Sequence, residues 1–198
     1  MSLIHNSNFK IMANTCMVSY AIEGNRRTLK RISVKINGAT KGTIPVKEGS
    51  SKNWQGNVLT ALNIKMHQCD TIRGFFYEEP KLDGGVLKFN CEEKWNRGDF
   101  AELLERKFPS LRVYWIAEES GCDIFETNDA DGKYFAERYW VDTCVNGDYD
   151  SEYFETEAAV WEYLTNRAGC KNAEDVDAFN DAVTNGEDFI YVHEFEIV

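Results

Sequence analysis

The chain of 198 residues carries 22 basic and 33 acidic residues, a net charge of −11, and 43% of its residues are hydrophobic. This composition, with 12 Phe, 9 Tyr and 5 Trp, is typical of a globular protein with a buried core and excludes a disordered chain. No apolar run approaches the roughly 20 residues of a membrane-spanning helix. Residues 1–11 lack the pattern of an export signal, so we expect a cytoplasmic protein.

Charge is divided unevenly along the chain. Residues 1–77 contain 11 basic and three acidic residues, whereas residues 78–198 contain 11 basic and 30 acidic residues. The resulting net charges are +8 and −19. An asymmetry of this kind indicates charged partners, or two faces of one fold that meet each other.

The first half of the chain alternates strand and helix patterns. Strict alternation from Cys16 to Ile22 predicts a half-buried strand. A helical period from Leu29 to Ile36 predicts a helix, which Gly38 ends. Further elements follow in this order: a surface loop from Ala39 to Asn53, a helix from Gly56 to His67, a strand from Thr71 to Glu78, a turn at Asp83–Gly85, a strand from Leu87 to Cys91, a helix from Phe100 to Phe108 capped by Asn96, and a strand from Leu111 to Ala117.

The order of these elements is βαββαβ, the split βαβ arrangement of ferredoxin-like folds. We therefore predict an α+β protein of one domain, with helices packed on one face of an antiparallel sheet. Its ferredoxin-like core spans residues 12–118 and includes a loop and helix insertion at about 39–70. Residues 119–198 extend this core with a hairpin, two helices and a final strand.

The extension is predicted to begin with a hairpin. Its strand-like runs are Cys122–Thr127 and Tyr134–Asp142, joined by Asn128–Gly132. Because Asp-Gly between alternating runs favours a hairpin turn, we expect these two runs to pair. Three further elements are expected: a helix at 156–168, a helix capped by Asn172, and a last strand from Phe189 to Ile197 in which His193 faces the core.

Several short motifs resemble the YubB-like ferredoxin-like family, small proteins encoded by plasmids, phages and conjugative elements. They are Met12 to Cys16 at the opening, Ile22-Glu23-Gly24 after the first strand, Phe108-Pro109-Ser110-Leu111, and Tyr114 leading to Gly121. The resemblance covers about residues 12–140, and it implies a ferredoxin-like fold and carriage on a mobile genetic element. It also implies that Met12 is the natural start of the chain. The family has no agreed activity, so the resemblance does not identify any catalytic residue.

Signatures of catalysis are missing from the sequence. The three histidines lack the spacing of a zinc site, and no phosphate-binding or nucleophile-elbow motif occurs. We therefore expect no metal and no cofactor, and a protein that acts by binding. One alternative stays open, because Cys16 or Cys91 can meet His193 in space as a nucleophile and its base.

The acidic extension is the predicted interaction surface, because its charge steers a basic protein partner. Carboxylates that replace phosphates would also make the protein an acidic DNA mimic. The residues of this predicted acidic surface are Glu126, Asp129, Asp131, Asp148, Asp150 and Glu152.

The alternative partner is a nucleic acid. Basic residues recur on one flank of the first predicted helix, where they can neutralise phosphates while sheet aromatics stack on bases. The residues of this basic flank are Arg27, Lys30, Arg31 and Lys35.

Overall fold

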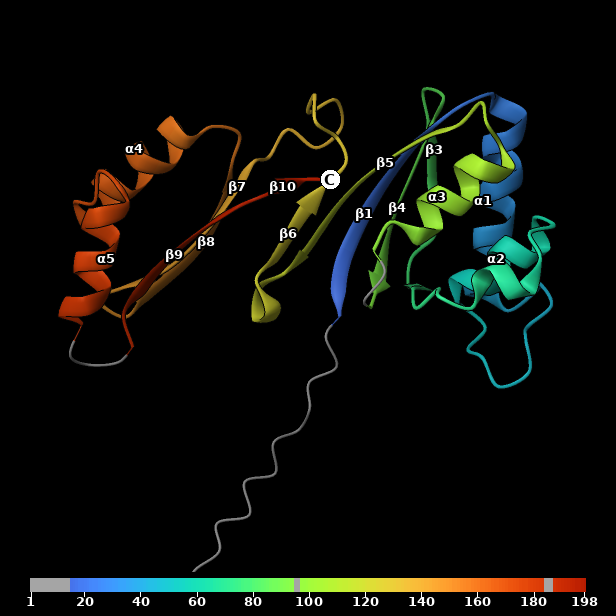
Figure 1. The fold of residues 1–198 in the computed structure, drawn as a ribbon, viewed down its shortest axis with the longest axis horizontal. Helices are drawn as coiled ribbons and strands as arrows, with labels where there is room; N and C mark the ends of the chain where they lie inside the picture. The colour runs from blue at the N-terminus through green and yellow to red at the C-terminus, as the bar shows by residue number, and fades with distance from the viewer. Residues whose placement is uncertain (1–14, 95–96, 184–186) are drawn as a thin grey trace, which may run out of the picture.

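The computed structural model describes residues 15–94, 97–183 and 187–198. It confirms the α+β class and the antiparallel sheet, but the strands form two sheets, each covered by helices on one face (Figure 1). The predicted cap Asn96 and the predicted start at Met12 lie outside the described residues.

The first half of the molecule has one mixed sheet. Its helices are α1 (Arg26–Lys41), α2 (Gln55–Ala61) and α3 (Asp99–Lys107), with 3-10 turns at Met66–Cys69 and Ser120–Cys122. Its strands are β1 (Cys16–Glu23), β2 (Phe75–Phe76), β3 (Lys81–Asp83), β4 (Val86–Glu93), β5 (Arg112–Glu119), β6 (Ile124–Thr127) and β10 (Glu196–Ile197).

The strand order of this first sheet is β10-β6-β5-β1-β4-β2, and β3 also pairs with β4. All of these pairs are antiparallel except that of β10 with β6. Alternate residues of β1 point toward the helices, so Val18 and Tyr20 lie against Leu29 and Phe100, all at most 1% exposed. Burying such a side chain stabilises the fold by roughly 1.5–3 kcal/mol. None of the helices in the described residues lies on the opposite face of the sheet (Figure 1).

Helix α1 runs further than its sequence pattern predicts. The side chain of Asn25 caps its start by accepting the backbone N–H of Thr28 at 2.9 Å. Gly38 does not end the helix, which continues to Lys41 and ends at Gly42 with φ 71°. Gly38 is buried because Ile44 folds back over it, and a Cβ at this position would lie 2.5 Å from Ile44 Cγ2.

The second half has its own sheet and its own hydrophobic core. Its strands are β7 (Tyr139–Val145), β8 (Asp148–Phe154) and β9 (Phe189–Glu194), in the antiparallel order β8-β7-β9. Helices α4 (Glu157–Ala168) and α5 (Ala173–Ala182) cover one face. As predicted, Asn172 caps α5, accepting the N–H of Asp175 at 2.9 Å. The core residues Val141, Val160, Leu164 and Ile190 are at most 1% exposed.

The predicted hairpin of 122–127 with 134–142 is wrong. β6 pairs with β5 and β10 in the first sheet, whereas β7 pairs with β8 and β9 in the second. The observed hairpin joins β7 to β8 through Asn146 and Gly147, with φ 55° and 76°. A tight two-residue turn needs positive φ at both positions, and Asn-Gly supplies it more readily than the Asp131-Gly132 pair inside a longer loop.

The predicted last strand is divided between the two sheets. β9 ends at Glu194 in the second sheet, Phe195 is buried, and β10 pairs with β6 in the first. The inward face is also the opposite of the predicted one, because Ile190 and Val192 face the helices while Tyr191 is 53% exposed.

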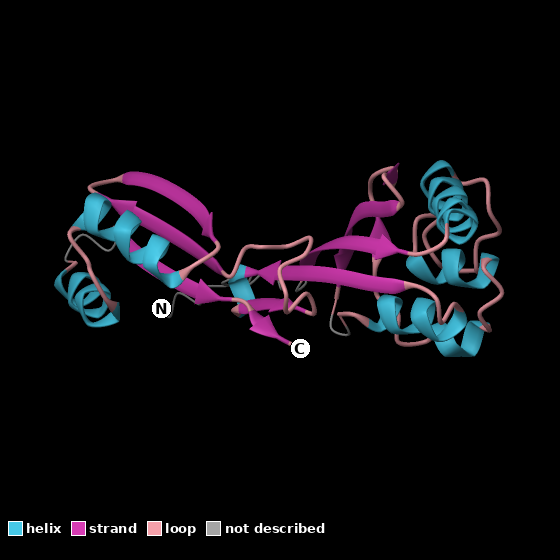
Figure 2. Cartoon of the chain, turned by 90° about the horizontal axis from the view of Figure 1, so that it is seen from above, coloured by secondary structure: helices cyan, strands magenta, loops and turns pink. Residues whose placement is uncertain are grey.

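Two helical layers therefore lie at opposite ends of the molecule, with the strands between them (Figure 2). The two halves are joined by the segment from β6 to β7 and by the step from β9 to β10. Among the described residues, no helix has both the length and the apolar character needed to cross a membrane.

Candidate binding surface

The uncovered face of the second sheet carries mainly aromatic side chains. Pairing of β7 with β8 and β9 places nine residues on it, in three rows across the sheet. The rows are Tyr153-Trp140-His193, Ser151-Asp142-Tyr191 and Tyr149-Cys144-Phe189. We call its six ring-bearing residues the aromatic face: Trp140, Tyr149, Tyr153, Phe189, Tyr191 and His193.

The rings of the aromatic face contact one another. Phe189 and Tyr191 stack with their centroids 5.2 Å apart, and Tyr149 lies edge-on to Phe189 at 6.4 Å. Tyr191 is in turn 6.3 Å from the ring of His193. Yet Tyr149, Tyr153 and Tyr191 remain 61%, 46% and 53% exposed. Large exposed aromatic side chains grouped on one sheet face mark a binding surface more often than a surface of no function.

One end of the aromatic face is packed against the first sheet. The ring of His193 stacks on Phe125 of β6 at 4.3 Å and on Trp140 at 5.3 Å, and Phe125 and Trp140 also stack on each other at 5.3 Å. His193 Nδ1 also lies 2.7 Å from a carboxylate oxygen of Asp123. The hydroxyl of Tyr153 donates to Glu118 of β5 at 2.5 Å. These contacts fix the position of the aromatic face relative to the first sheet.

Surface pockets lie along the junction between the first and second sheets. One, of about 230 Å³, is lined by Met17, Ser19 and Ile116 from the open face of the first sheet and by Phe135 and Tyr153. Another, of about 330 Å³, lies beside Phe125, Tyr191 and His193 and includes the carboxylates of Asp123 and Glu194. An extended ligand on the aromatic face would therefore find further apolar and acidic contacts at the junction.

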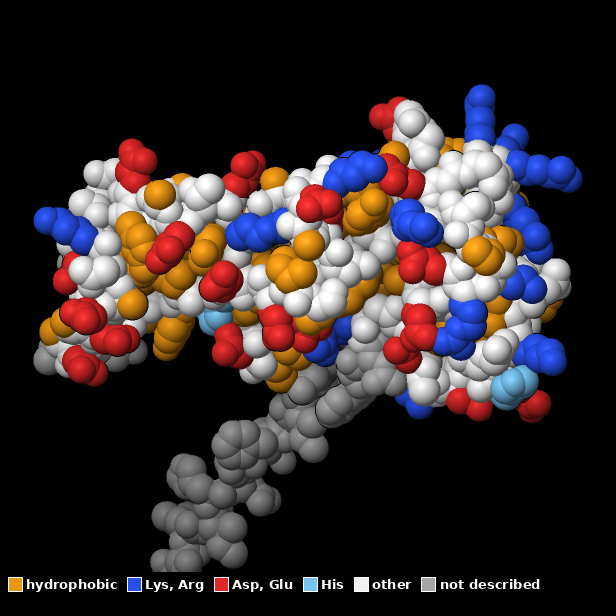
Figure 3. Space-filling model, turned by 45° about the horizontal axis from the view of Figure 1, so that its top comes forward, with side chains coloured by type: hydrophobic (Ala, Val, Ile, Leu, Met, Phe, Trp, Pro, Cys, Tyr) orange, Lys and Arg blue, Asp and Glu red, His pale blue; other side chains and the backbone are white. Residues whose placement is uncertain are grey.

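Charge is strongly negative around the aromatic face. Residues 139–198 carry 15 acidic and two basic residues, a net charge of −13, so the rest of the chain is close to neutral at +2. In the space-filling view, Lys and Arg gather at the end of the molecule that holds α1, and Asp and Glu are dense around α4 and α5 (Figure 3). The aromatic face thus belongs to the acidic end.

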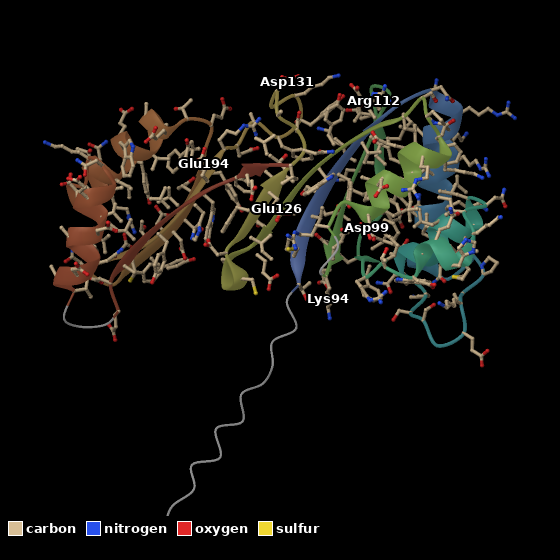
Figure 4. The ribbon with its side chains drawn as sticks, in the orientation of Figure 1. Lys94, Asp99, Arg112, Glu126, Asp131 and Glu194 are labelled. Atoms are coloured by element: carbon tan, nitrogen blue, oxygen red, sulfur yellow. The ribbon has the colours of Figure 1, made fainter. Side chains whose placement is uncertain are left out.

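The predicted acidic surface is not one surface. Figure 4 shows Asp131 in the loop that follows β6, away from Glu126 on the strand itself. Asp131 is exposed, but Asp129 is only 1% exposed and accepts the backbone N–H groups of Lys133, Tyr134 and Phe135 at 2.7–3.0 Å. Asp129 is therefore a buried residue that shapes the loop, because its carboxylate replaces water for three backbone donors.

Glu126 also has an intramolecular role. Its carboxylate pairs with both Nε and the terminal nitrogen of Arg97, at 2.9 and 2.5 Å, on the helix-covered side of the first sheet. The bidentate geometry fixes the two side chains and leaves that of Glu126 22% exposed.

The three acidic residues of β8 lie together, on the side of the sheet that bears α4. Asp148 and Asp150 are 3.2 and 3.9 Å from the guanidinium of Arg167, and the hydroxyl of Tyr163 donates to Asp150 at 3.0 Å. Glu152 is exposed. These carboxylates add to the negative field but point away from the aromatic face.

The basic flank is present on α1. Arg27, Lys30 and Arg31 are exposed, while Lys35 is partly buried. The guanidinium of Arg31 lies 5.7 Å from the ring centroid of Phe108, a cation–π contact. The structure thus brings three of the four predicted bases to the surface.

Among the described residues, neither Cys16 nor Cys91 lies near His193, as the predicted nucleophile and base would require. Cys16 and Cys91 are buried in the first core on the helix-covered face of the sheet, whereas His193 stands on the uncovered face of the second. Burial raises the pKa of the Cys16 thiol to about 12, the reverse of what a nucleophile needs. No group of three His, Cys, Asp or Glu within residues 15–94, 97–183 and 187–198 is placed to hold a metal ion.

Sequence reasoning missed the aromatic face, although a signal for it exists. Asn146-Gly147 is a strong cue for a hairpin, and its position fixes the pairing of the flanking residues. That register places Tyr149 and Tyr153 on the same face as Trp140 and Asp142.

Comparison of the chain with protein-family models, with curated proteins and with solved structures gave no match.

Proposed function

We propose that the protein is a non-catalytic binding protein whose aromatic face receives a basic segment of a protein partner. The observation that carries this proposal is the exposure of Tyr149, Tyr153 and Tyr191 on one uncovered sheet face. Aromatic rings attract Lys and Arg through cation–π contacts worth about 0.5–1 kcal/mol at exposed sites.

Charge favours a basic partner over a nucleic acid at this surface. Aromatic sheet faces do bind single-stranded nucleic acids by stacking, but such sites lie in positively charged grooves. Residues 139–198 have a net charge of −13, which repels phosphates and attracts cationic segments. The basic cleft of a DNA-binding protein is one such partner surface. A protein that binds this cleft in place of DNA acts as a DNA mimic, so DNA mimicry is one form of the proposed function.

The exposed residues of the predicted acidic surface have a secondary role in binding the basic partner. Asp131, Asp148, Asp150 and Glu152 lie away from the aromatic face and act through their long-range field. We expect their reversal to slow association and to change its salt dependence, because charges outside the contact steer encounter more than they hold the complex.

The test is fluorescence anisotropy with a labelled octa-arginine peptide, at about 50 and 200 mM salt, where screening differs. We expect binding to the wild type that weakens with salt. Replacing both Tyr149 and Tyr191 with Ala should lower the affinity about tenfold, because the double variant removes two exposed cation–π interactions while the charge is unchanged.

The matched control is Tyr77→Ala, which removes a tyrosine 47% exposed in the first half of the molecule. It should leave the affinity unchanged. The proposal fails if the peptide does not bind at low salt, or if the Tyr149/Tyr191 double variant binds as tightly as the control.

A second candidate function is nucleic-acid binding by the basic flank. The observation that favours it is the placement of Arg26 and Arg27 in the first turn of α1, a helix without any Asp or Glu. Cations are unfavourable at that end of a helix dipole, so these residues do not serve the stability of the helix.

Its test uses labelled single- and double-stranded DNA under the same two salt conditions. Replacing Arg27 and Arg31 with Ala should weaken binding about equally for all sequences. It should also reduce the slope of the logarithm of the binding constant against the logarithm of the salt concentration, by about one for each phosphate that the variant no longer neutralises. Lys81→Ala, an exposed lysine of β3, is the control. Absence of DNA binding at 50 mM salt would exclude this function.

We also propose that the first sheet and its helices form a ferredoxin-like core. The order β5-β1-β4-β2, with α1 after β1 and α3 after β4, supports this. Membership of the YubB-like family and carriage on a mobile genetic element remain predictions from the sequence motifs.

A further inference from the structure

A single carboxylate stands at the centre of the aromatic face. Asp142 pairs with Ser151 on β8 and with Tyr191 on β9. Its same-face neighbours along β7 are Trp140 and Cys144. All six residues of the aromatic face therefore surround it, either beside it or one position away diagonally.

One of the two oxygens of this carboxylate lacks a hydrogen-bond partner among the described residues. Asp142 Oδ1 is buried from solvent and has no hydrogen-bond partner among the described residues. A buried polar atom without a partner costs roughly 1–3 kcal/mol, and such atoms are rare in native structures. The other face of the sheet shows the contrast, because Asp148 and Asp150 there both pair with Arg167.

The tyrosine beside it is affected by the same carboxylate. A hydrogen bond to the Asp142 carboxylate is the largest cause that raises the pKa of the Tyr149 hydroxyl, so this hydroxyl already contacts the carboxylate. Tyr191 lies directly across the strand pair from Asp142 and is stacked with Phe189, so one of its ring faces is already covered by an aromatic platform. The site thus combines a negative charge with a stacked pair of rings.

We infer that Asp142 is the receptor for one arginine side chain of the basic segment, whose guanidinium replaces the Tyr149 hydroxyl at the carboxylate and lies over the ring of Tyr191. This inference rests on the proposed function and names the group that the aromatic face recognises. A guanidinium fits because it is planar, stacks on aromatic rings and presents donors to a carboxylate in a fixed geometry. A lysine ammonium is a compact, strongly hydrated charge, and on an open sheet face it gains less from the rings.

The experiment is a titration followed by ¹H–¹⁵N NMR on the 22.7 kDa chain. The probes are N-acetyl-arginine amide, N-acetyl-lysine amide and N-acetyl-citrulline amide, the last a neutral isostere of arginine. We expect the arginine derivative to shift the backbone signals of Asp142, Ser151 and Tyr191. The lysine derivative should shift them less at equal concentration, and the citrulline derivative should leave them in place.

Two variants locate the effect. Asp142→Asn keeps the shape of the side chain and should abolish the shifts, whereas Asp177→Asn, an exposed acid of α5, should keep them. Tyr191→Leu is the second test of the site, and it should also reduce the shifts. Unchanged dispersion of the remaining signals shows that each variant is folded.

The outcomes separate this inference from the proposed function. The receptor role of Asp142 is overturned if citrulline shifts the same signals as arginine, or if Asp142→Asn responds like the wild type. The receptor role alone is overturned if octa-arginine binds through Tyr149 and Tyr191 while Asp142→Asn binds it equally well. We expect instead a loss of at least about tenfold, the lower limit for a hydrogen bond to a charged group. If octa-arginine does not bind, both ideas fail.

Discussion

The hydroxyl of Tyr153 donates a hydrogen bond to Glu118 across the junction of the two sheets, with an oxygen–oxygen distance of 2.5 Å. Tyr153 belongs to the edge strand β8 of the second sheet, and Glu118 to β5 of the first. Burial of Tyr153 is the largest cause that raises its pKa, followed by this bond, so the hydroxyl stays a donor at neutral pH. The bond ties the aromatic face to the first sheet.

Removal of this hydroxyl tests how firmly the sheets are joined. Tyr153→Phe should lower the free energy of unfolding by about 0.5–1 kcal/mol, the low part of the range for a hydrogen bond, because the pair is half-exposed. Urea unfolding followed by tryptophan fluorescence measures the change. Tyr191→Phe is the control, since no hydrogen bond of its hydroxyl is found among the described residues. Equal destabilisation by both variants would mean that the bond does not join the sheets.

The two hydrophobic cores predict two unfolding transitions. Leu164→Ala removes a fully buried side chain from the second core and should lower the stability of that half by about 2–5 kcal/mol. Leu104→Ala should act equally on the first core. Calorimetry should then show each variant shifting a different transition. One transition that both variants shift alike would show instead that the halves unfold together.

Glu93 predicts a pH dependence of stability. It is 2% exposed in the first core, and burial raises its pKa above the ordinary value of 4.5. Between that value and the raised pKa, the native state holds more protons than the unfolded chain. The free energy of unfolding should therefore fall as the pH rises from about 4.5, and the full loss is present above the raised pKa.

Glu93→Gln removes this titration. Tyr20 and Gln55 both donate to the same oxygen, Oε1, at 2.6 Å, and the amide oxygen of Gln can accept both bonds. The variant should therefore lose less stability than the wild type between pH 4.5 and 8 in urea unfolding. Glu92→Gln, the exposed neighbour on the other face of β4, should keep the wild-type pH dependence. A wild-type pH dependence in Glu93→Gln would show that another group is responsible.

Local patterns in the sequence predict most of the first half. Leu29, Ile32 and Ile36 form a buried helix face as their spacing indicates, and alternation in β1 identifies its core-facing side. These predictions succeed because each depends on one element meeting one core. Gly38 is one exception, since its role depends on contact with Ile44 from outside the helix. The predicted helix from Gly56 to His67 and the predicted strand from Thr71 to Glu78 are also too long, because α2 ends at Ala61 and β2 contains only Phe75 and Phe76.

Long-range pairing explains the failures in the second half. The run 189–197 alternates throughout, but its two parts enter different sheets, and alternation alone does not reveal which face is covered. Asp142 looks like one more acid in an acidic segment. Its importance arises only from the register that surrounds it with residues of β8 and β9, which no local pattern contains.

Asp129 and Asp131 illustrate the difference between a buried acidic residue that stabilises a loop and an exposed one that does not. Asp129→Ala would leave the N–H groups of Lys133, Tyr134 and Phe135 without their acceptor in a partly buried loop, so we expect a loss of about 3 kcal/mol in the free energy of unfolding. Asp131→Ala, two residues on and exposed, should change it by less than about 0.5 kcal/mol. Urea unfolding measures both, and octa-arginine anisotropy on the folded variants shows whether either acts in binding. Similar stability of the two variants would mean that Asp129 does not hold the loop, and its carboxylate would return to the candidate interaction residues.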